Sequence, residues 1–342
     1  MVRNIRAVRG RVAIAVALPS VLLAAACGGS SGGTSSSSAA AATAGLTAQQ
    51  TIAAEVPSSI KGTPVQIAVD ATYAPNEFID PATGEIKGWD IDLGNAFCKV
   101  MGLVCTFNNV TFDDIIAQLK ASTPSEQAGG DKPRYQFSMS SWSPTAKREM
   151  SGIDFISYYQ AGEGWVAKAG GTKVTSVSQF CGHKVAVESG TTEESDAWGY
   201  MGMNVGGGAI SGDTDHCSGQ DMTVDSYSTQ TQADQALESG RDDFGYLDTP
   251  VATYEQKVSN GKLDGGPLMV SGQPCAVAPY GIAIVQGGAL ETALQDAVKY
   301  LITSGYYGKI LSSWNVTAGA IPASQVTLNN NNTVGGACVP SY

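Results

Sequence analysis

Side chains able to hold a small charged solute recur along the chain, mostly where an expected strand ends or an expected helix begins. These segments are Asp70-Ala71-Thr72-Tyr73, Phe112, Ser140-Ser141-Trp142-Ser143 with Arg148 just beyond, Glu188-Ser189-Gly190-Thr191-Thr192, and Asp248. Ligands of α/β folds bind at the carboxyl ends of strands, and a strand-to-helix junction such as Ser189–Thr192 directs free backbone N–H groups at an anion. Each residue alone also has an ordinary structural explanation, as a helix cap, a core aromatic or a solvated charge, so the hypothesis of binding rests on the set.

Signatures of catalysis are scarce. The sequence has no phosphate-binding Gly-x-x-x-x-Gly-Lys-Ser/Thr loop and no His-Glu-x-x-His zinc motif. It contains only two histidines, His183 and His216, and both lie beside cysteines. The glycines at 202 and 206–208 lack the strand-turn-helix setting of a dinucleotide fingerprint. These absences favour binding over catalysis, and we expect neither a cofactor nor a metal.

Composition narrows the class of partner. The 342 residues include 20 Lys and Arg against 31 Asp and Glu, which gives a formal net charge of −11. Such an acidic chain lacks the positive field that phosphate neutralisation requires, so nucleic acid is excluded as an expected partner. With 43% hydrophobic residues the chain can bury a core, and its length suggests one or two domains.

Strand and helix patterns alternate along the chain and must position the binding segments. Strand-like segments are expected at 65–69, 135–139, 184–187, 243–247 and 280–285, and amphipathic helices at 90–101, 111–119 and 290–301. Asp90 and Gly102 would cap the first of these helices, and Thr111 the second. Alternation at this spacing predicts α/β layers with mainly parallel sheets.

The N-terminus has the pattern of an export signal. Several arginines precede an apolar run of about 15 residues, which is too short to span a membrane. We therefore expect residues 1–26 to be a signal peptide. Leu23-Ala24-Ala25-Ala26-Cys27 resembles the lipobox of bacterial lipoproteins, in which the cysteine is lipidated. A cleaved signal with an incidental cysteine is the alternative, but the Gly-, Ser- and Ala-rich stretch that follows favours an anchor with a flexible tether over 27–58.

Six cysteines remain after Cys27 and would lie in an oxidising compartment. Six cysteines allow fifteen pairings. Cys181 and Cys217 flank the middle of the chain, and Cys275 and Cys338 lie near its end. Together with His183 and His216, the middle pair could also form a Cys₂His₂ zinc site. For an exported protein we favour disulfides, Cys181–Cys217 and Cys275–Cys338.

Five ordered motifs resemble the solute-binding proteins of amino-acid ABC importers, the family of the lysine/arginine/ornithine-, histidine- and glutamine-binding proteins. The resemblance runs from about Val65 to Trp314. The motifs are Asp70-x-x-Tyr73-x-Pro75, Gly88-Trp89-Asp90-Ile91-Asp92-Leu93, Ser140-Ser141-x-Ser143-x-Thr145-x-x-Arg148, Ser189-Gly190-Thr191-Thr192, and Tyr246-Leu247-Asp248 before Val251-Ala252. The pair Cys98 and Cys105 resembles the cysteines that basic-amino-acid binders bridge at this place.

The resemblance implies a two-lobe periplasmic-binding-protein fold (type II), with lobes joined by two hinge strands. Lobe 1 would comprise residues 59–163 and 280–342, and lobe 2 residues 164–279. Arg148 would bind the ligand α-carboxylate, helped by N–H groups near Ser143 and Thr192. Asp248 would bind the α-ammonium with the Ser141 carbonyl, while Tyr73 and Phe112 would enclose the ligand side chain and Trp142 would add a wall.

The remaining expected site residues bear on the choice of ligand. Asp70 matches the position that reads side-chain amino or amide groups in several relatives, and Ser140 and Thr191 belong to the matched segments. Glu77, Glu188 and Glu193 either line the expected cleft or face solvent. An acidic cleft favours arginine, lysine, ornithine or glutamine over acidic amino acids.

We therefore expect a monomeric, lipid-anchored, extracytoplasmic protein that captures an L-amino acid and delivers it to an ABC permease with its ATPase. Two alternatives remain. One is a cyclohexadienyl or arogenate dehydratase on the same fold, with Glu188 or Glu193 as acid/base. The other is a ligand-presenting component of a sensor, which would need a signalling partner because the sequence has no signalling domain.

Overall fold

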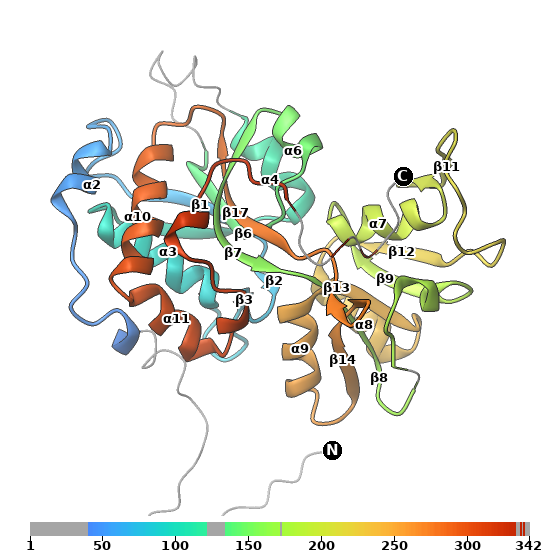
Figure 1. Cartoon of the computed structure of the whole chain (residues 1–342). Coiled ribbons are helices and arrows are strands. Elements are labelled where there is room, and N and C mark those ends of the chain that lie inside the picture. The colour runs from blue at the N-terminus through green and yellow to red at the C-terminus, as the bar shows by residue number, and fades with distance from the viewer. Residues whose placement is uncertain (1–39, 122–133, 172, 333–335, 337, 339–342) are drawn as a thin grey trace, which may run out of the picture. The chain divides into compact units, whose positions relative to one another are not determined.

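The computed structural model describes residues 40–121, 134–171, 173–332, 336 and 338, and in this range the chain forms two α/β lobes around two five-stranded sheets (Figure 1). The expected signal peptide and Cys27 lie outside the described residues. The two-lobe fold agrees with the architecture implied by the sequence motifs.

Lobe 1 is built on a mixed sheet with helices on both faces. Its strands, in order across the sheet, are β5 (Cys105–Asn109), β1 (Val65–Val69), β6 (Phe137–Trp142), β17 (Ala278–Val285) and β7 (Ile153–Ala161). Ile67 and Val69 face a core that also contains residues of α3 (Trp89–Val100), α10 (Glu291–Thr303) and α11 (Tyr306–Trp314). Ala68 points to the opposite face, where α4 (Phe112–Leu119) packs. The alternation of side chains along a strand thus gives the sheet two buried faces.

Lobe 2 repeats this arrangement with a second mixed sheet. Its strands are β12 (Thr223–Tyr227), β9 (Lys184–Glu188), β13 (Phe244–Asp248), β8 (Glu163–Lys168) and β14 (Leu263–Pro267). Its helices are α7 (Thr192–Tyr200), α8 (Gln230–Ser239) and α9 (Thr249–Val258). Tyr246 and Leu247 are neighbours in β13 but belong to different core clusters, one on each face of the sheet.

The expectation of mainly parallel sheets was wrong. In lobe 1, β1 runs parallel to β5 and β6, but β17 runs antiparallel to β6 and β7. In lobe 2, β9 runs parallel to β12 and β13, but β8 runs antiparallel to β13 and β14. The chain passes from β7 of one sheet directly into β8 of the other and returns through β17. Of these crossing strands, β17 runs opposite to the parallel strands of lobe 1, and β8 runs opposite to those of lobe 2. Strand direction depends on which strands pair, and the hydrophobic pattern does not contain that information.

Three disulfides are formed in the structure, Cys98–Cys105, Cys181–Cys217 and Cys275–Cys338. The last joins the C-terminal part of the chain to the core of lobe 2, against which Cys338 packs. The Ala276 N–H also donates to the Gly336 carbonyl at 2.7 Å. The assignment of all of 280–342 to lobe 1 is therefore corrected at its end, because Gly336 and Cys338 contact lobe 2.

Part of the expected tether packs on lobe 1 instead. The helix α2 (Gln50–Glu55) buries Ile52, and Leu46 and Val56 are each only 2% exposed within the lobe 1 core. These apolar side chains remove the segment from solvent, so a free tether is not present at residues 46–56. The Gly- and Ser-rich composition that predicts flexibility ends before this segment.

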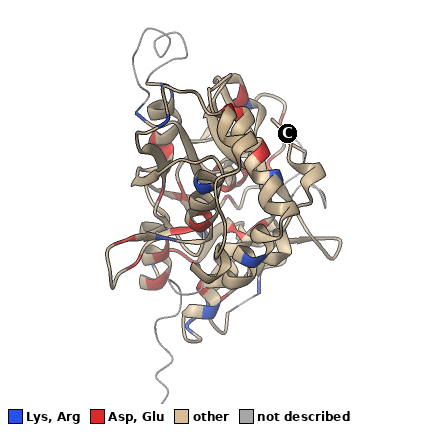
Figure 2. Ribbon diagram, turned by 90° about the vertical axis from the view of Figure 1, so that its left-hand side faces the viewer, with Lys and Arg blue, Asp and Glu red and all other residues tan. Residues whose placement is uncertain are grey.

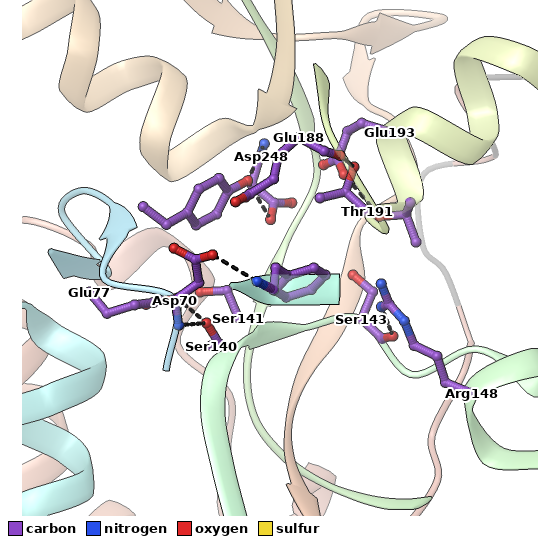
Figure 3. A pocket seen from close by; sticks show the side chains of 13 residues that line it. Asp70, Glu77, Ser140, Ser141, Ser143, Arg148, Glu188, Thr191, Glu193 and Asp248 are labelled. Carbon is purple, nitrogen blue, oxygen red and sulfur yellow. Dashed lines mark hydrogen bonds between the residues drawn. The ribbon is translucent and has the colours of Figure 1, made fainter. Parts of the chain in front are cut away.

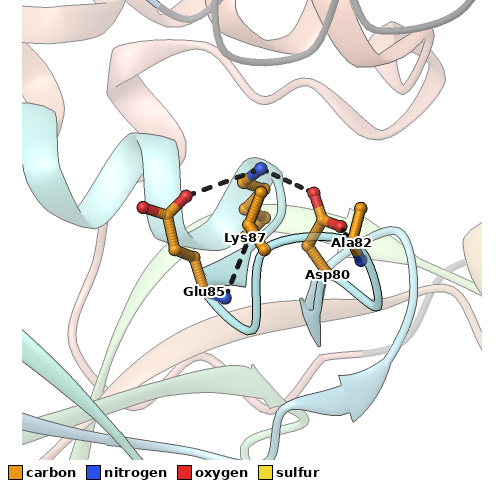
Figure 4. A network of polar contacts seen from close by, with 5 residues as sticks. Asp80, Ala82, Glu85 and Lys87 are labelled. Atoms are coloured by element: carbon orange, nitrogen blue, oxygen red, sulfur yellow. Dashed lines mark hydrogen bonds and ion pairs between the residues drawn. The ribbon is translucent and has the colours of Figure 1, made fainter. Parts of the chain in front are cut away.

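A small three-stranded sheet of β2 (Thr72–Tyr73), β3 (Glu77–Ile79) and β4 (Ile86–Lys87) projects from the end of β1. Lys87 ties its turn together by ion pairs with Asp80 at 2.5 Å and Glu85 at 3.6 Å (Figure 4). Gly88 follows with φ of 139°, and a Cβ there would lie 1.9 Å from the Asn76 carbonyl oxygen. Only glycine can therefore link this sheet to α3 at such close approach.

The other elements are short. They are β10 (Met203–Asn204), β11 (Gly208–Ala209), β15 (Met269–Val270), β16 (Gln273–Pro274), α6 (Ala146–Met150), and the 3₁₀ turns Val177–Phe180, Thr317–Gly319 and Ala323–Gln325. None of the helices in the described ranges has the length and apolar character needed to cross a bilayer. Acidic residues are distributed over the ribbon of both lobes and outnumber the basic ones (Figure 2).

Candidate functional site

A pocket lies where strands of both sheets end, and its lining comes from both lobes (Figure 3). Asp70 follows β1, and Ser140 and Ser141 belong to β6 of lobe 1. Glu188 ends β9, and Asp248 ends β13 of lobe 2. The lining residues are Asp70, Tyr73, Glu77, Phe112, Ser140, Ser141, Ser143, Arg148, Glu188, Thr191, Thr192, Glu193 and Asp248. The structure thus brings together every residue expected at the site except Trp142.

Arg148 is the basic residue of this lining. The helix α6 carries it, and the Thr145 hydroxyl caps that helix by accepting from the Arg148 N–H at 3.2 Å. Its guanidinium donates to the Ser143 carbonyl at 2.6 Å and, across the lobes, to the Gly190 carbonyl at 2.8 Å. Burial lowers the pKa of Arg148 to about 10, so it stays protonated at neutral pH. A guanidinium has five N–H donors, and those not used by these two carbonyls can bind a carboxylate.

Two aromatic rings support Arg148. Phe112 and Trp142 stack with ring centroids 4.1 Å apart, and the guanidinium carbon lies 4.9 Å from the centroid of Trp142 and 5.5 Å from that of Phe112. Trp142 is only 2% exposed and donates from Nε1 to the Ser138 hydroxyl at 2.9 Å. The expectation that Trp142 forms a wall of the pocket is therefore corrected: it lies behind Phe112 and holds that ring and Arg148 in place.

Asp248 lies on the lobe 2 side of the pocket. Burial raises its pKa to about 6, although hydrogen bonds from Tyr280 and Tyr73 oppose this shift. The Tyr73 hydroxyl of lobe 1 donates to Asp248 Oδ2 at 3.0 Å and accepts from the Asp248 N–H at 2.9 Å. Tyr73 packs with the hydrophobic residues of lobe 2 through its ring. It therefore both lines the pocket and joins the lobes.

Asp70 is held at the end of the pocket formed by lobe 1. Its carboxylate accepts from the Phe112 N–H at 2.8 Å and from the Thr72 hydroxyl at 2.6 Å. Burial nevertheless raises the pKa of Asp70, and it raises the pKa of Glu188 well above its usual range. After burial, the repulsion of Asp70 is the largest cause of the raised pKa of Glu188, so these two carboxyl groups of different lobes lie close together.

Glu77 and Glu193, for which the sequence left the cleft and solvent both open, complete the lining. Glu77, Glu188 and Glu193 are 0%, 3% and 2% exposed, which decides between the cleft and solvent in favour of the cleft. Glu77 accepts from the Ser140 hydroxyl at 2.9 Å, and Glu193 lies close enough to Asp248 for repulsion to raise its pKa, after the larger effect of burial. A carboxylate next to a matched motif is a weak signal in sequence, since most such residues face solvent.

Asn76 lies next to the pocket and makes structural contacts. It is fully buried, accepts from Trp89 Nε1 at 2.7 Å and donates to the Ser141 hydroxyl at 2.8 Å. The amide thus positions the β6 end that borders the pocket. It does not line the pocket itself.

The structure does not supply the ligands of the Cys₂His₂ zinc site that the sequence left open. The Cys181–Cys217 disulfide uses both sulfurs of the possible Cys₂His₂ zinc set. Within the described residues, the one close group of metal-type side chains is Glu163 with Cys275 and Cys338, and those two cysteines also form a disulfide. Without thiolates, neither group offers a zinc site.

Known proteins resemble this chain over most of its length. Residues 65–317 match the model of the bacterial extracellular solute-binding proteins, family 3. The arginine-binding protein ArgT of Corynebacterium glutamicum is 27% identical over 79% of this chain and 80% of its own. The histidine-binding periplasmic protein of Salmonella typhimurium is 26% identical over 73% of this chain and 86% of its own. A solved structure of an ancestral arginine-binding protein bound to arginine superposes with a TM-score of 0.57 at 27% identity, covering 75% of this chain and 99% of that one.

The match to the family model spans both lobes and contains the whole pocket lining. The similar proteins are named for binding and not for catalysis, which favours a binding protein over the dehydratase alternative. The chain belongs to family 3 of the bacterial extracellular solute-binding proteins.

Proposed function

We propose that this protein captures an L-amino acid outside the cytoplasm and delivers it to an ABC permease by closing its two lobes around the ligand. The observation that carries the proposal is the placement of Arg148 on lobe 1 and Asp248 on lobe 2 at one pocket. A zwitterion needs a cation and an anion at its two α-substituents, and these residues supply both.

Arg148 would bind the α-carboxylate. Its guanidinium is fixed by the Ser143 and Gly190 carbonyls and by the stacked rings of Phe112 and Trp142, so little side-chain entropy remains to be lost on binding. The N-terminus of α7, with Thr191 and Thr192 in the lining, adds backbone N–H groups that favour an anion.

Asp248 would bind the α-ammonium together with the Ser141 carbonyl. The Tyr73 hydroxyl already orients the carboxylate, and Glu193 adds a second negative group at the same place. Because the carboxylate and ammonium partners belong to different lobes, ligand binding and lobe closure would be coupled.

The side chain of the ligand would extend toward Asp70 and Glu188, beside Phe112. Apart from Arg148, the lining has no basic side chain, whereas it has the carboxyl groups of Asp70, Glu77, Glu188, Glu193 and Asp248. This charge distribution favours arginine, lysine, ornithine or glutamine and disfavours aspartate and glutamate. Relatives named for arginine and histidine support the same class.

The setting would be the outer face of a bacterial cell membrane. A lipid on Cys27 would hold the protein there, a permease with its ATPase would be the partner, and a monomer would suffice because both lobes of the pocket come from one chain. Mass measurement of the mature protein tests the lipid on Cys27, and sedimentation tests the monomer.

Calorimetric titration of the protein lacking residues 1–39 against all common amino acids, ornithine and citrulline tests the ligand class. We expect a dissociation constant in the micromolar range or below for at least one basic amino acid or glutamine, since three or four charge-assisted hydrogen bonds of about 1.5–3 kcal/mol can supply it after the cost of ordering. Heat signals at the level of buffer dilution for the whole panel would refute the proposal.

A further inference from the structure

Asp70 and Glu188 form a carboxyl pair across the two lobes. Asp70 follows β1 of lobe 1 and is 1% exposed, and Glu188 ends β9 of lobe 2 and is 3% exposed. Both side chains line the same pocket. Two buried carboxyl groups that line one pocket repel each other when both are ionised, so a positive charge beside them favours the contact.

The contact lies at a place where the lobes meet directly. The Gln230 N–H of α8 donates both to Glu188 Oε1 at 3.1 Å and to the Thr72 hydroxyl of lobe 1 at 3.2 Å. The Thr72 hydroxyl in turn donates to Asp70 Oδ1 at 2.6 Å. Any repulsion between Asp70 and Glu188 would therefore push directly against the closed arrangement of the lobes.

In the described part of the chain, the ionisable groups that act on this pair are carboxyl groups. Glu77 faces Asp70 from β3 of lobe 1, and Asp234 faces Glu188 from α8 of lobe 2. Glu77 itself lies against Asp90 of α3. The further charged groups of the lining, Glu193 of α7, Asp248 of β13 and Arg148 of α6, interact with one another.

We propose that the Asp70–Glu188 pair is a latch that closes the cleft around one positive charge, supplied either by a proton or by the cationic end of the ligand side chain. This inference rests on the proposed function and goes beyond it, because it makes the proton a competitor of the ligand. At neutral pH a cationic side chain replaces the proton and holds the lobes together. At acid pH the proton closes the cleft without ligand and weakens ligand binding.

The latch predicts a requirement for charge. Arginine, lysine or ornithine can supply the positive group, whereas glutamine and citrulline present a neutral amide or ureido group to the same place. These neutral ligands can accept a hydrogen bond from a protonated pair but cannot displace its proton. Their affinity should therefore depend on pH only through the α-ammonium site, where the pKa of Asp248 is raised to about 6 by burial.

Calorimetry with arginine and citrulline at pH 5.5 and pH 8, each in two buffers of different ionisation enthalpy, tests the competition. We expect the affinity for arginine to fall by up to tenfold for each pH unit below the pKa of the pair, with about one proton released per ligand bound. Citrulline should show the smaller change due to the α-ammonium site alone. An arginine affinity that changes with pH no more than that of citrulline would overturn the latch.

Two variants separate the latch from other titrating groups. Glu188→Gln gives a neutral amide that can donate to Asp70 without a proton, so the part of the pH dependence specific to arginine should disappear. Glu85→Gln makes the same change at a side chain that is 70% exposed and far from the pocket lining, and it should behave as the wild type. If Glu188→Gln kept the full pH dependence of arginine binding, the pair would not be the site of competition.

Small-angle scattering of the ligand-free protein provides an independent measurement. We expect a smaller radius of gyration at pH 5.5 than at pH 8 for the wild type, and no such difference for Glu188→Gln. Equal radii for the wild type at both pH values would contradict closure by a proton. If no amino acid binds in any condition, the proposed function fails, while the scattering result still decides on the latch.

Discussion

Replacement of Arg148 by alanine is the sharpest test of the zwitterion clamp. The guanidinium is held by the Ser143 and Gly190 carbonyls at 2.6 and 2.8 Å, and it is the basic group of the pocket lining. Removing one partner of a buried, hydrogen-bonded charge pair costs about 2–5 kcal/mol. At about 1.4 kcal/mol for each tenfold change, the dissociation constant should rise by about 30-fold to several thousand-fold.

Part of this loss would not come from the ligand. Arg148 also bridges the lobes through Gly190, so its removal weakens the closed state as well. Argininamide, which lacks the α-carboxylate, separates the two effects. The wild type should bind arginine much more tightly than argininamide, and Arg148→Ala should bind the two with similar affinity, because the carboxylate has lost its partner.

The control is Arg241→Ala. Arg241 also lies over an aromatic ring, with its guanidinium carbon 5.5 Å from the Tyr227 centroid, but it is not part of the pocket. This variant should bind arginine like the wild type. If Arg148→Ala discriminated arginine from argininamide as strongly as the wild type does, Arg148 would not bind the carboxylate.

Two further predictions concern stability. Burial raises the pKa of Asp90 to about 7 and that of Asp92 to about 6, so the folded protein binds protons that the unfolded chain has released above about pH 4. The free energy of unfolding should therefore fall as pH rises from 5 to 8, by at most about 1.4 kcal/mol per pH unit for each proton that only the folded state holds. Calorimetric melting of the ligand-free protein should show a lower Tm at pH 8 than at pH 5, with a smaller decrease for Asp90→Asn. An unchanged or higher Tm at pH 8 would contradict the raised pKa values. Gly88→Ala should lower the free energy of unfolding, measured with urea, by more than about 3 kcal/mol, because the added Cβ would overlap the Asn76 carbonyl. Gly84→Ala, at φ of 71° with open space around the added Cβ, should cost only about 1 kcal/mol. Equal losses would show that backbone conformation alone is responsible.

Much of the fold could be predicted from local sequence patterns. Alternating Val65, Ile67 and Val69 form β1, and the helical spacing from Leu93 to Met101 corresponds to α3. Such periodicities arise from the geometry of a single element, so they are present in the sequence of that element. The same holds for the strand-end segments that contain Asp70, Ser140 and Asp248, whose types and order indicated a binding pocket.

Contacts between distant segments were decided only by the tertiary structure. The Tyr73 hydroxyl meets Asp248 across 175 residues of sequence, and the placement of Trp142 behind Phe112 follows from the packing of α4 on β6. The antiparallel pairing of the crossing strands and the contact of Cys338 with lobe 2 likewise join segments that are distant in the sequence.

The acidic residues show most clearly which properties follow from the sequence and which follow from the tertiary structure. Their number, and the net charge of −11, can be read from the sequence and are the reason that no nucleic-acid partner is expected. Whether a glutamate faces water or another carboxyl group depends on how two lobes pack, because burial and proximity are properties of the folded chain. The sequence by itself determined an acidic α/β chain whose motifs resemble those of a two-lobe family of binding proteins, and the tertiary structure alone placed Asp70 and Glu188 at one pocket.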